Sequence, residues 1–329
     1  MIRTENKIDD AKDVLRLASE MSREYYHKPL IICYSGGKDS DVLLQIALEC
    51  LNPSDFEVLN SHTTVDAPET VYYIRDKFKY LEELGVKATI QIPHYPDGRP
   101  KTMWSLIEDK QMPPTRFARY CCKELKEISA PNRFVVLGVR EDESAGRKGR
   151  AVFATHGARK ENAYYYYYSH VKEVFEDDVS RRSKGGVDAN TVGVYDCTFI
   201  TKAKQNKKLI CNPIYNLSNT EIWEFIHDRR MKYNPLYDMG YTRVGCIGCP
   251  LANSQRLDLE KYPKYKLNYI RAFDRMLQKR REAGKDDVTG KTGLHKWTNG
   301  EVVYRWWIRD DTIDGQTTIF DYIEKGENE

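Results

Sequence analysis

The sequence predicts an α/β protein with a doubly wound, mostly parallel sheet, an insertion and a helical C-terminal part. Three observations lead to this prediction. Short apolar runs alternate with segments of helical periodicity, which is the element order of a parallel sheet covered by helices. A glycine-rich loop follows the first apolar run and precedes a helical segment. The alternation stops near residue 151 and resumes near residue 210.

The first half of the chain contains the predicted strands and their helices. A helix is expected over residues 8–26, where apolar residues recur at three- and four-residue steps. Four runs are expected to be strands, namely PLIICY, FEVLNSHT, KATIQIPH and RFVVLGVR. DVLLQIALECL and the segment that ends at Gly85 are expected to be helices between them, because glycine commonly ends a helix.

The second half begins with a charged, tyrosine-rich segment. Residues 151–209 contain AYYYYYSH, EDDVSRRSKGG and TKAKQNKK, and are expected to form an insertion that is partly mobile. Helices resume at NLSNTEIWEFIHDR, where Ser218 and Glu221 have the spacing of a capping box, and over residues 262–284. The predicted organisation is a nucleotide-binding core over 1–150, an insertion over 151–209, and a C-terminal part of the core over 210–329.

Composition and charge narrow the class of protein. The net charge of +3 creates no overall field that would require a nucleic-acid partner. No run of 18 apolar residues is present and the first residues lack the apolar segment of a signal peptide, so we expect no membrane span and a cytoplasmic location. In that compartment the eight cysteines are expected to be ligands, catalysts or core residues more often than disulfides.

The loop SGGKDS has the features of a phosphate-binding site. Its glycines allow backbone N–H groups to approach an anion, and the helix that follows adds the positive end of its dipole. Asp39 replaces the Ser or Thr of a Walker A loop and the first glycine of that pattern is missing, so a kinase or GTPase loop is excluded. An ordinary strand-to-helix turn is the alternative. The predicted phosphate-binding residues are Ser35, Gly36, Gly37, Lys38, Asp39 and Ser40.

SGGKDS resembles the PP-loop of the ATP pyrophosphatase, or adenine nucleotide α-hydrolase, superfamily. The resemblance implies a Rossmann-like fold that binds ATP with Mg²⁺ and cleaves ATP between the α and β phosphates. TVDAPET, which contains Asp66, is similar to the family segment that closes on the nucleotide. LGVREDESAGR is similar to the motif that places arginines near phosphates, here Arg140 and Arg147. The resemblance implies catalytic roles for Lys38, Asp39 and Arg140; without it, the two arginines would be assigned to a solvated loop.

Four cysteines occur in two close pairs, Cys121-Cys122 and the CxxC of Cys246 and Cys249. Each pair alone fits a zinc half-site, a redox pair or half of an iron–sulfur site. Together they provide four thiolates, enough for zinc or a [4Fe–4S] cluster, although adjacent side chains diverge and fit tetrahedral zinc poorly. Buried structural thiols are a third alternative. The remaining cysteines are expected to be core residues, namely Cys33, Cys50, Cys197 and Cys211.

The CC…CxxC pattern is similar to the signature that ligates a [4Fe–4S] cluster in bacterial adenylylsulfate reductases. The segment from NPIYNLSNTEIWEFI to YNPLYDMGYTRVGCIGC also follows the phosphoadenylylsulfate-reductase-like family. The chain departs from the reductases at their nucleophile, which lies in a C-terminal Glu-Cys-Gly-x-His. The nearest counterpart here is KTGLHK, and no cysteine follows Cys249. The chain therefore resembles more closely the ATP pyrophosphatase component of DNA phosphorothioation systems, which implies sulfur transfer from a cysteine desulfurase.

Two segments bear on a nucleic-acid substrate. The predicted helix over residues 261–281 carries eight basic residues, opposite an apolar face that contains Leu267, Ile270, Phe273 and Leu277. Such helices can follow phosphates, and a solvated basic face is the alternative. The five tyrosines at 164–168 can stack on unpaired bases, with packing inside the insertion as the alternative.

The sequence therefore predicts an ATP pyrophosphatase with a [4Fe–4S] cluster, which adenylates a DNA or RNA substrate for sulfur incorporation. One alternative is a sulfonucleotide reductase with a displaced nucleophile. Another is a redox-sensing nucleic-acid-binding protein that is not an enzyme, and ATP turnover separates it from the first two. The substrate, the sulfur donor and the oligomeric state are left open by the sequence.

Overall fold

The computed structural model describes residues 2–143, 152–156, 208–285, 288–289 and 295–308. The chain forms two compact units, of which unit 1 comprises Met1–His94 and Cys122–Gly245, and unit 2 comprises Tyr95–Cys121 and Cys246–Glu329. This division differs from the one expected at residues 150 and 209, because the CxxC and the basic helix join residues 95–121 in a unit of their own. Arg147, Cys197 and the five tyrosines lie outside the described residues.

Unit 1 is built on a six-stranded sheet, with the strand order β3-β2-β1-β4-β6-β5. Adjacent strands are parallel except β5, which is antiparallel to β6. The predicted α/β class with a doubly wound, mostly parallel sheet is thus confirmed. The strands are β1 (Leu30–Cys33), β2 (Phe56–Ser61), β3 (Lys87–Gln91), β4 (Phe134–Val136), β5 (Phe153–His156) and β6 (Lys208–Cys211).

Strands β5 and β6 border the segment that was predicted to be an insertion. Strand β5 ends at His156 and therefore lies inside the expected insertion of residues 151–209, and β6 begins at Lys208, within its last two residues. Each strand has only four residues. A run of this length beside polar sequence carries too little periodicity to be recognised as a strand.

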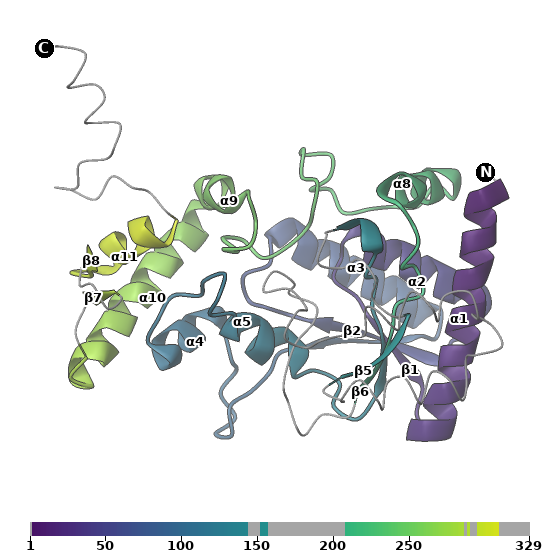
Figure 1. Cartoon of the computed structure of the whole chain (residues 1–329), viewed down its shortest axis with the longest axis horizontal. Coiled ribbons are helices and arrows are strands. Elements are labelled where there is room, and N and C mark those ends of the chain that lie inside the picture. Colours follow the sequence, from purple (N-terminus) through teal and green to yellow (C-terminus); the bar gives the residue numbers. More distant parts are fainter. Residues whose placement is uncertain (1, 144–151, 157–207, 286–287, 290–294, 309–329) are drawn as a thin grey trace, which may run out of the picture. The chain divides into compact units, whose positions relative to one another are not determined.

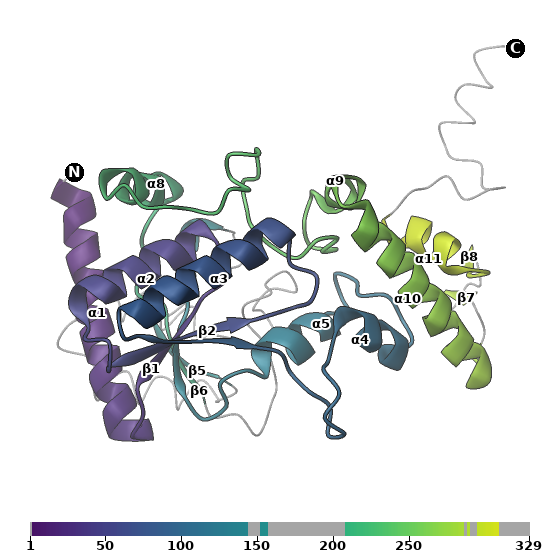
Figure 2. The same cartoon turned by 180° about the vertical axis from the view of Figure 1, so that it is seen from behind.

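The described part of unit 1 also contains four longer helices and two short ones. The longer helices are α1 (Ile2–Tyr26), α2 (Lys38–Cys50), α3 (Pro68–Glu83) and α8 (Asn219–Asp228). The short ones are the π-helix η1 (Lys123–Glu127) and the 3₁₀-helix η2 (Glu141–Glu143), and the boundary between the units falls within α5 (Tyr120–Cys122). In both views α2 and α3 run side by side (Figures 1 and 2), and α2 also contacts α1 and α8.

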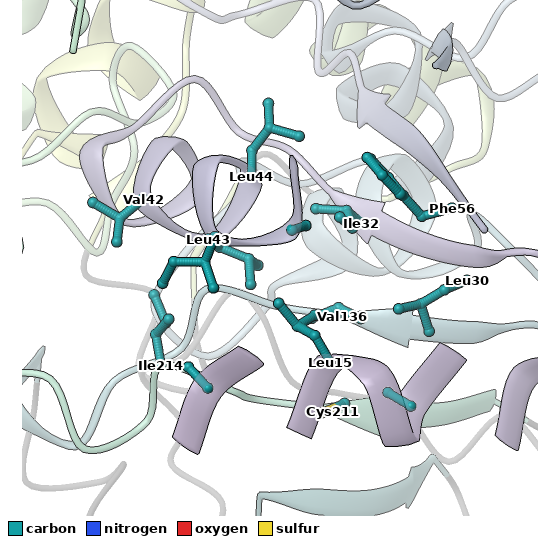
Figure 3. Packing of buried hydrophobic residues seen from close by; sticks show 14 of the residues in the cluster. Leu15, Leu30, Ile32, Val42, Leu43, Leu44, Phe56, Val136, Cys211 and Ile214 are labelled. Carbon is teal, nitrogen blue, oxygen red and sulfur yellow. The ribbon is translucent and has the colours of Figure 1, made fainter. Parts of the chain in front are cut away.

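The core of unit 1 covers both faces of the sheet, which explains the continuous apolar runs in the sequence. Leu30 and Ile32 of β1 belong to the large cluster formed with α1, α2 and α8, whereas Ile31 belongs to a smaller cluster that contains Val135 and Ile210. Figure 3 shows side chains of α2, among them Leu43, close to those of the strands and of α1. The packed helix fixes the position of the loop that precedes it.

Unit 2 consists of helices and a two-stranded hairpin. The elements are α4 (Met103–Lys110), α9 (Gln255–Lys261), α10 (Pro263–Glu282), β7 (Val288–Thr289), β8 (His295–Lys296) and α11 (Gly300–Trp307). Helix α10 packs against α4 and α11. The prediction that Leu267 belongs to the apolar face of α10 is wrong, because this residue is 51% exposed. The face that is buried consists of Tyr269, Ala272, Phe273, Met276 and Leu277.

Across the ranges that the structure describes, no helix combines the length and the apolar character needed to span a membrane.

Candidate functional site

The PP-loop lies where the strand order of the sheet reverses. Strands β2 and β3 lie on one side of β1, and β4 and β6 lie on the other. In doubly wound sheets, ligands bind beyond the carboxyl ends of the strands at this reversal point. Residues 35–40 follow β1 and Arg140 follows β4, so the structure brings these two sets of predicted site residues together.

The conformation of the loop depends on its glycines. Gly36 has a φ of +73°, and a Cβ atom there would lie 2.9 Å from the side chain of Ile74. Gly37 is the N-cap of α2 and has no side chain with which to cap the helix. The Ser40 hydroxyl donates to the Gly37 carbonyl over 2.7 Å, which closes the turn from inside. The N-terminus of α2 therefore presents its positive end without a protein anion bound to it.

Three charged side chains meet beside this helix end. Arg140 Nε donates to Asp39 Oδ1 over 2.6 Å, and Lys38 Nζ donates to Asp39 Oδ2 over 3.3 Å. Lys38 and Arg140 are only 6% and 2% exposed. Burial lowers the pKa of Lys38, which Asp39 opposes and Arg140 reinforces. Because each carboxylate oxygen of Asp39 binds a cation, Asp39 arranges the two cations in this state rather than offering a vacant pair of oxygens to Mg²⁺.

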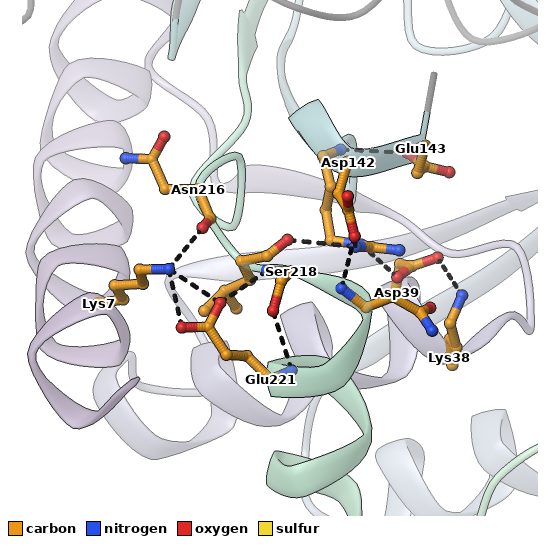
Figure 4. Close-up of polar contacts among 11 residues, drawn as sticks. Lys7, Lys38, Asp39, Asp142, Glu143, Asn216, Ser218 and Glu221 are labelled. Atoms are coloured by element: carbon orange, nitrogen blue, oxygen red, sulfur yellow. Dashed lines mark hydrogen bonds and ion pairs between the residues drawn. The ribbon is translucent and has the colours of Figure 1, made fainter. Parts of the chain in front are cut away.

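Arg140 is held by the chain on three sides. Its Nη1 donates to the Leu217 carbonyl over 3.2 Å, and its backbone N–H donates to Glu143. The carboxylate of Asp142 accepts from the backbone N–H of Asn219 at the start of α8 (Figure 4). These contacts connect the turn after β4 to the N-terminus of α8 and keep the buried guanidinium directed at Asp39.

The capping box predicted at α8 is confirmed. Ser218 accepts from the backbone N–H of Glu221 over 3.2 Å, and Glu221 accepts from that of Ser218 over 2.7 Å. Lys7 of α1 also donates to Glu221 over 2.8 Å (Figure 4). The helix start that positions Leu217 against Arg140 is therefore fixed from within and from α1.

The segment after α8 contributes loop contacts that the sequence reading missed. The Asn234 amide, which is fully buried, donates to the Gly36 carbonyl over 2.9 Å. Tyr237 accepts from the backbone N–H of Lys38 at the start of α2, also over 2.9 Å. Both residues belong to YNPLY, a segment that resembles the family but whose residues were given no predicted function. They fix the loop from a position about 200 residues away in the chain.

A buried carboxylic acid directly under the loop was also missed. The Tyr34 hydroxyl donates to Asp41 over 2.5 Å, and Lys77 lies 3.9 Å from the same carboxylate. Burial raises the pKa of Asp41 to about 6, although Lys77, Tyr34 and Tyr73 oppose the shift. Asp41 follows Ser40 in the first turn of α2, so its burial ties this end of the helix to the aromatic side chains below it.

Asp66, predicted to contact the nucleotide, lies in the turn after β2. It accepts from the backbone N–H of Thr63 over 2.9 Å and pairs with His62. Burial alone would raise its pKa, but hydrogen bonds from His62 and Thr63 and the charge of Lys126 outweigh burial and lower it. Asp66 thus stays ionised and orders its own turn. A contact with nucleotide remains a prediction.

The CxxC of unit 2 forms a tight turn over an aromatic cluster. The backbone N–H of Cys249 donates to the Cys246 carbonyl over 3.2 Å, and Gly248 between them has a φ of +71°. A Cβ atom at Gly248 would lie 3.1 Å from the ring of Tyr269. Burial raises the pKa of Tyr269, and the thiolate charges of Cys246, Cys121 and Cys249 raise it further. The three predicted ligands of unit 2 therefore all act electrostatically on one buried side chain.

The fourth cysteine, Cys122, is buried in unit 1 and directly precedes the π-helix η1. Within the described ranges, no three His, Cys, Asp or Glu side chains lie close enough together to hold a metal ion. The chemistry of the donor set, with half-buried thiols at Cys121, Cys246 and Cys249, nevertheless fits a thiolate-ligated group. The cluster stays a prediction.

Of the other cysteines, Cys211 is a core residue, as expected, and Cys33 is half-buried against the smaller cluster. Burial raises the pKa of Cys33 to about 11 and raises that of Cys211, which is fully buried, still more clearly. Burial also raises the pKa of Cys50 to about 11, and this thiol is half-buried.

The basic residues of α10 are partly engaged inside unit 2. Arg275 pairs with Glu108 of α4, and Lys279 pairs with Asp109 over 3.0 Å. Their side chains are still 48% and 43% exposed. These ion pairs give the two residues a structural role, and binding of nucleic acid by α10 stays a prediction.

Comparison with known proteins gives both relatives and a family. An uncharacterised protein of Methanocaldococcus jannaschii, MJ0066, is 23% identical over 278 residues, which are 83% of this chain and 47% of that protein. An adenosine 5'-phosphosulfate reductase of Bacillus cytotoxicus is 22% identical over 251 residues, which are 74% of this chain and 82% of the reductase. The chain spans about half the length of the curated Methanocaldococcus relatives that it matches.

The similar solved structures have lower sequence identity. The phosphoadenylyl-sulfate reductase of Candida auris has a TM-score of 0.40 and 13% identity, over 72% of this chain and 87% of that one. The U34-tRNA thiolase NcsA of Methanococcus maripaludis, solved with its [4Fe-4S] cluster, has a TM-score of 0.37 and 14% identity, over 87% of this chain and 86% of that one. The model of the phosphoadenosine phosphosulfate reductase domain matches residues 29–252, a range that includes the PP-loop, Arg140 and the CxxC. The chain therefore belongs to the phosphoadenosine phosphosulfate reductase domain family.

Proposed function

We propose that the protein is an ATP pyrophosphatase that adenylates a nucleic-acid substrate for sulfur incorporation, as in DNA phosphorothioation. One observation carries this proposal: two buried cations, Lys38 and Arg140, lie beside the N-terminus of α2 and are bridged by Asp39. Fixed cations and helix dipoles stabilise negative charge that develops on a leaving pyrophosphate, and they need little rearrangement to do so.

The proposed reaction has three steps. An oxygen of the substrate attacks the α phosphorus of ATP, the α–β phosphoanhydride bond breaks, and pyrophosphate leaves into the loop. A persulfide, supplied by a cysteine desulfurase in the cytoplasm, then attacks the atom that carries the adenylated oxygen, and AMP leaves with that oxygen. A second thiol cleaves the S–S bond of the adduct, so the outer sulfur stays on the substrate and the donor cysteine forms a disulfide with that thiol. Ser35, Ser40 and the backbone N–H groups of Asp39 and Ser40 would bind the pyrophosphate oxygens, with Lys38 and Arg140 neutralising their charge.

A [4Fe–4S] cluster on Cys121, Cys122, Cys246 and Cys249 is part of the same proposal. When bound, such a cluster supplies iron that can hold or pass on sulfur. The protein's own contribution in unit 2 is the tight CxxC turn and the aromatic surroundings of Tyr269, which lower the polarity around the half-buried thiols.

The test is the product pattern of ATP cleavage. Anoxically purified protein is incubated with Mg²⁺ and α-labelled ATP, with and without single-stranded DNA or RNA. We expect AMP and pyrophosphate, and a loss of at least about a hundredfold in Lys38→Ala and Arg140→Ala, since removing one preorganised charge-stabilising group commonly has that effect. ADP and phosphate as the main products would contradict the proposal.

A sulfonucleotide reductase is the second candidate, because a relative over 74% of this chain is an adenosine 5'-phosphosulfate reductase. That reaction needs an accessible thiolate. Cys211 is fully buried and its pKa is raised by burial, which argues against it as the nucleophile. We expect no sulfite from adenylylsulfate or phosphoadenylylsulfate with thioredoxin. Sulfite formation that is abolished in Cys197→Ser would favour the reductase instead.

A further inference from the structure

Unit 1 contains an open pocket beside the PP-loop that has no role in the site described above. Its volume is about 350 Å³, near the lower end of the range of about 300–1,000 Å³ for small-molecule sites. Three lining residues, Asn219, Trp223 and His227, recur every four positions on one face of α8. The others come from the segment after α8, namely Tyr233, Tyr237, Asp238, Tyr241 and Thr242. We call this site the aromatic pocket.

The aromatic side chains of the pocket hold one another in place. The edges of Tyr233 and Tyr237 contact the Trp223 ring at centroid distances of 5.3 and 5.2 Å, with interplanar angles of 89° and 88°. His227 lies nearly parallel to the Trp223 ring, at 5.8 Å and 22°. The Tyr233 hydroxyl donates to Asp238 over 2.9 Å. Rings fixed in this way lose little conformational entropy when a planar ligand stacks on them.

Polar groups accompany these rings. The pocket also includes the side chains of Asn219, Asp238 and Thr242, which are exposed and offer an amide, a carboxylate and a hydroxyl. A nucleobase has hydrogen-bond donors and acceptors on its edge and π surfaces above and below. The combination of aromatic faces with a few polar groups therefore matches a nucleobase better than it matches an aliphatic ligand.

Exposed basic residues flank the aromatic pocket in the chain. Arg230 and Lys232 lie between α8 and Tyr233, and Arg243 follows Thr242; all three are exposed. No ion pair engages these three side chains anywhere in the described part of the protein. The charge of Arg243 lowers the pKa of Lys38, which places Arg243 near the loop. A polynucleotide with one base in the pocket would find cations for its phosphates at both ends of the segment that follows α8.

The pocket and the PP-loop share one wall. Tyr237 lines the pocket, and its hydroxyl accepts from the backbone N–H of Lys38. Lys38 Nζ also lies 5.8 Å from the centre of the Tyr237 ring. A ligand stacked in the pocket is therefore one side chain away from the start of α2, where pyrophosphate is proposed to bind.

We propose that the aromatic pocket binds one unpaired base of a single-stranded nucleic acid and so positions the acceptor strand at the PP-loop. This inference rests on the proposed function for the identity of the second substrate, and it names that substrate as an unpaired nucleotide. A base inside a duplex is covered on both faces and paired along its edge, so it does not enter the pocket without leaving the duplex.

The experiment measures fluorescence anisotropy of labelled 12-nucleotide strands with the full chain, without ATP, in 50 and 200 mM NaCl. We expect single strands to bind more tightly than the matched duplex. Trp223→Ala should weaken binding at least about fivefold, the lower end of what one stacked base contributes, and Trp223→Phe should recover most of the loss. Arg230→Glu with Lys232→Glu should weaken binding and reduce its salt dependence, whereas Lys79→Glu on α3 should change neither.

Several outcomes would overturn the inference. The first is that Trp223→Ala binds the single strand as tightly as the wild type does. The second is that the duplex binds as tightly as the single strand. The third is that AMP displaces the strand, which would make the pocket the adenine site. The two exposed substitutions remain informative where Trp223→Ala unfolds. The products of ATP cleavage are measured in parallel. If ATP yields AMP and pyrophosphate but strand binding does not depend on the pocket residues, this inference alone is wrong. If ATP yields ADP but strand binding does depend on them, the proposed function alone is wrong.

Discussion

Arg140 Nε donates to Asp39 Oδ1 over 2.6 Å, joining two residues 101 positions apart at the carboxyl ends of neighbouring strands. The other oxygen of Asp39 accepts from Lys38. The three side chains carry a net charge of +1 beside the N-terminus of α2. Asp39 therefore keeps two mutually repelling cations together until a more negative group replaces it as their partner.

This arrangement predicts that Asp39 and Arg140 depend on each other in stabilising the leaving pyrophosphate. Asp39→Asn and Arg140→Gln should each reduce pyrophosphate release from ATP by about 10²- to 10³-fold, because each change displaces a preorganised charge. The double variant should lose little more than either single variant, since groups that act together are not additive. Initial rates of pyrophosphate release measure the effect.

The control for this prediction is an exposed pair of the same kind. Arg99 Nε donates to Asp97 over 2.7 Å, with side chains that are 70% and 51% exposed. Arg99→Gln should leave the rate unchanged. The outcome that contradicts the prediction is multiplicative. If the double variant reduces the rate of pyrophosphate release by the product of the two single reductions, Arg140 and Asp39 act independently.

A second prediction concerns the close approach of β4 to the loop. A Cβ atom at Gly138 would lie 3.1 Å from the Asp39 carbonyl oxygen and 3.3 Å from the Ser40 nitrogen. Gly138→Ala should therefore displace the loop backbone, raise the KM for ATP, and reduce the free energy of unfolding by about 1–3 kcal/mol, as overpacking does. Steady-state kinetics and chemical denaturation measure the two effects.

Gly245→Ala is the matched control, because a Cβ atom there meets nothing within 4 Å. Its KM for ATP should equal that of the wild type. An unchanged KM in Gly138→Ala would mean that the loop tolerates the displacement and that the close approach has no role in binding ATP.

Local patterns explain why the sheet and the loop were predictable from sequence. The period of apolar residues distinguishes α1 and α3 from the strands, and the glycines of residues 35–40 follow a short apolar run directly. The alternation of Leu30 and Ile31 between two clusters is not visible in the sequence, because a strand buried on both faces is apolar throughout.

The missed parts of the site depend on contacts between distant segments. Asn234 and Tyr237 reach the loop from 198 and 199 residues away, and nothing in the composition of YNPLY marks either as a loop ligand. The pairing of Arg275 with Glu108 spans 167 residues. An amphipathic basic helix has the same sequence pattern whether its charges face solvent or an acidic neighbour.

The third prediction is that the buried Asp41 makes the free energy of unfolding depend on pH. Its pKa is about 6 in the folded protein against 3.8 for an unperturbed group, so the folded state binds more protons between these values and stability falls as pH rises through them. The shift of roughly two units corresponds to about 3 kcal/mol at neutral pH. Asp41→Asn should remove this slope, since an amide still accepts from Tyr34 but does not ionise.

Urea denaturation of both proteins at pH 4, 5, 6 and 7 tests this prediction. The variant should gain stability over the wild type progressively from pH 4 to pH 7. Asp76→Asn, an exposed change on α3, is the matched control for the substitution itself. A pH-independent difference for Asp41→Asn would mean that the carboxylate is ionised in the folded protein throughout this range.

The fourth prediction concerns the thiols of the two cysteine pairs. Protein purified without oxygen should carry about four irons and absorb as a [4Fe–4S] protein. Replacing any one of Cys121, Cys122, Cys246 or Cys249 by Ser should remove the iron and the absorption. Cys50→Ser should keep both, because Cys50 lies at the end of α2 in unit 1. Stoichiometric zinc without iron would contradict the cluster.

The last prediction separates stability from nucleic-acid binding on α10. Arg275→Glu places a second carboxylate beside Glu108 and should lower the free energy of unfolding by about 1 kcal/mol, in the range of exposed ion pairs. Adding Glu108→Arg restores the opposite charges and should restore most of that stability. Chemical denaturation measures both changes.

The charge-swapped protein then tests what α10 contributes to binding. Its net charge is unchanged, but the cation at position 275 has moved to α4. If the aromatic pocket supplies the main contacts, the swapped protein should bind a single strand as tightly as the wild type and with the same salt dependence. A refolded, stable swap with weaker binding and a smaller salt dependence would show that Arg275 itself contacts phosphates. Lys264→Glu with Arg271→Glu, two exposed residues of α10, should then weaken binding further.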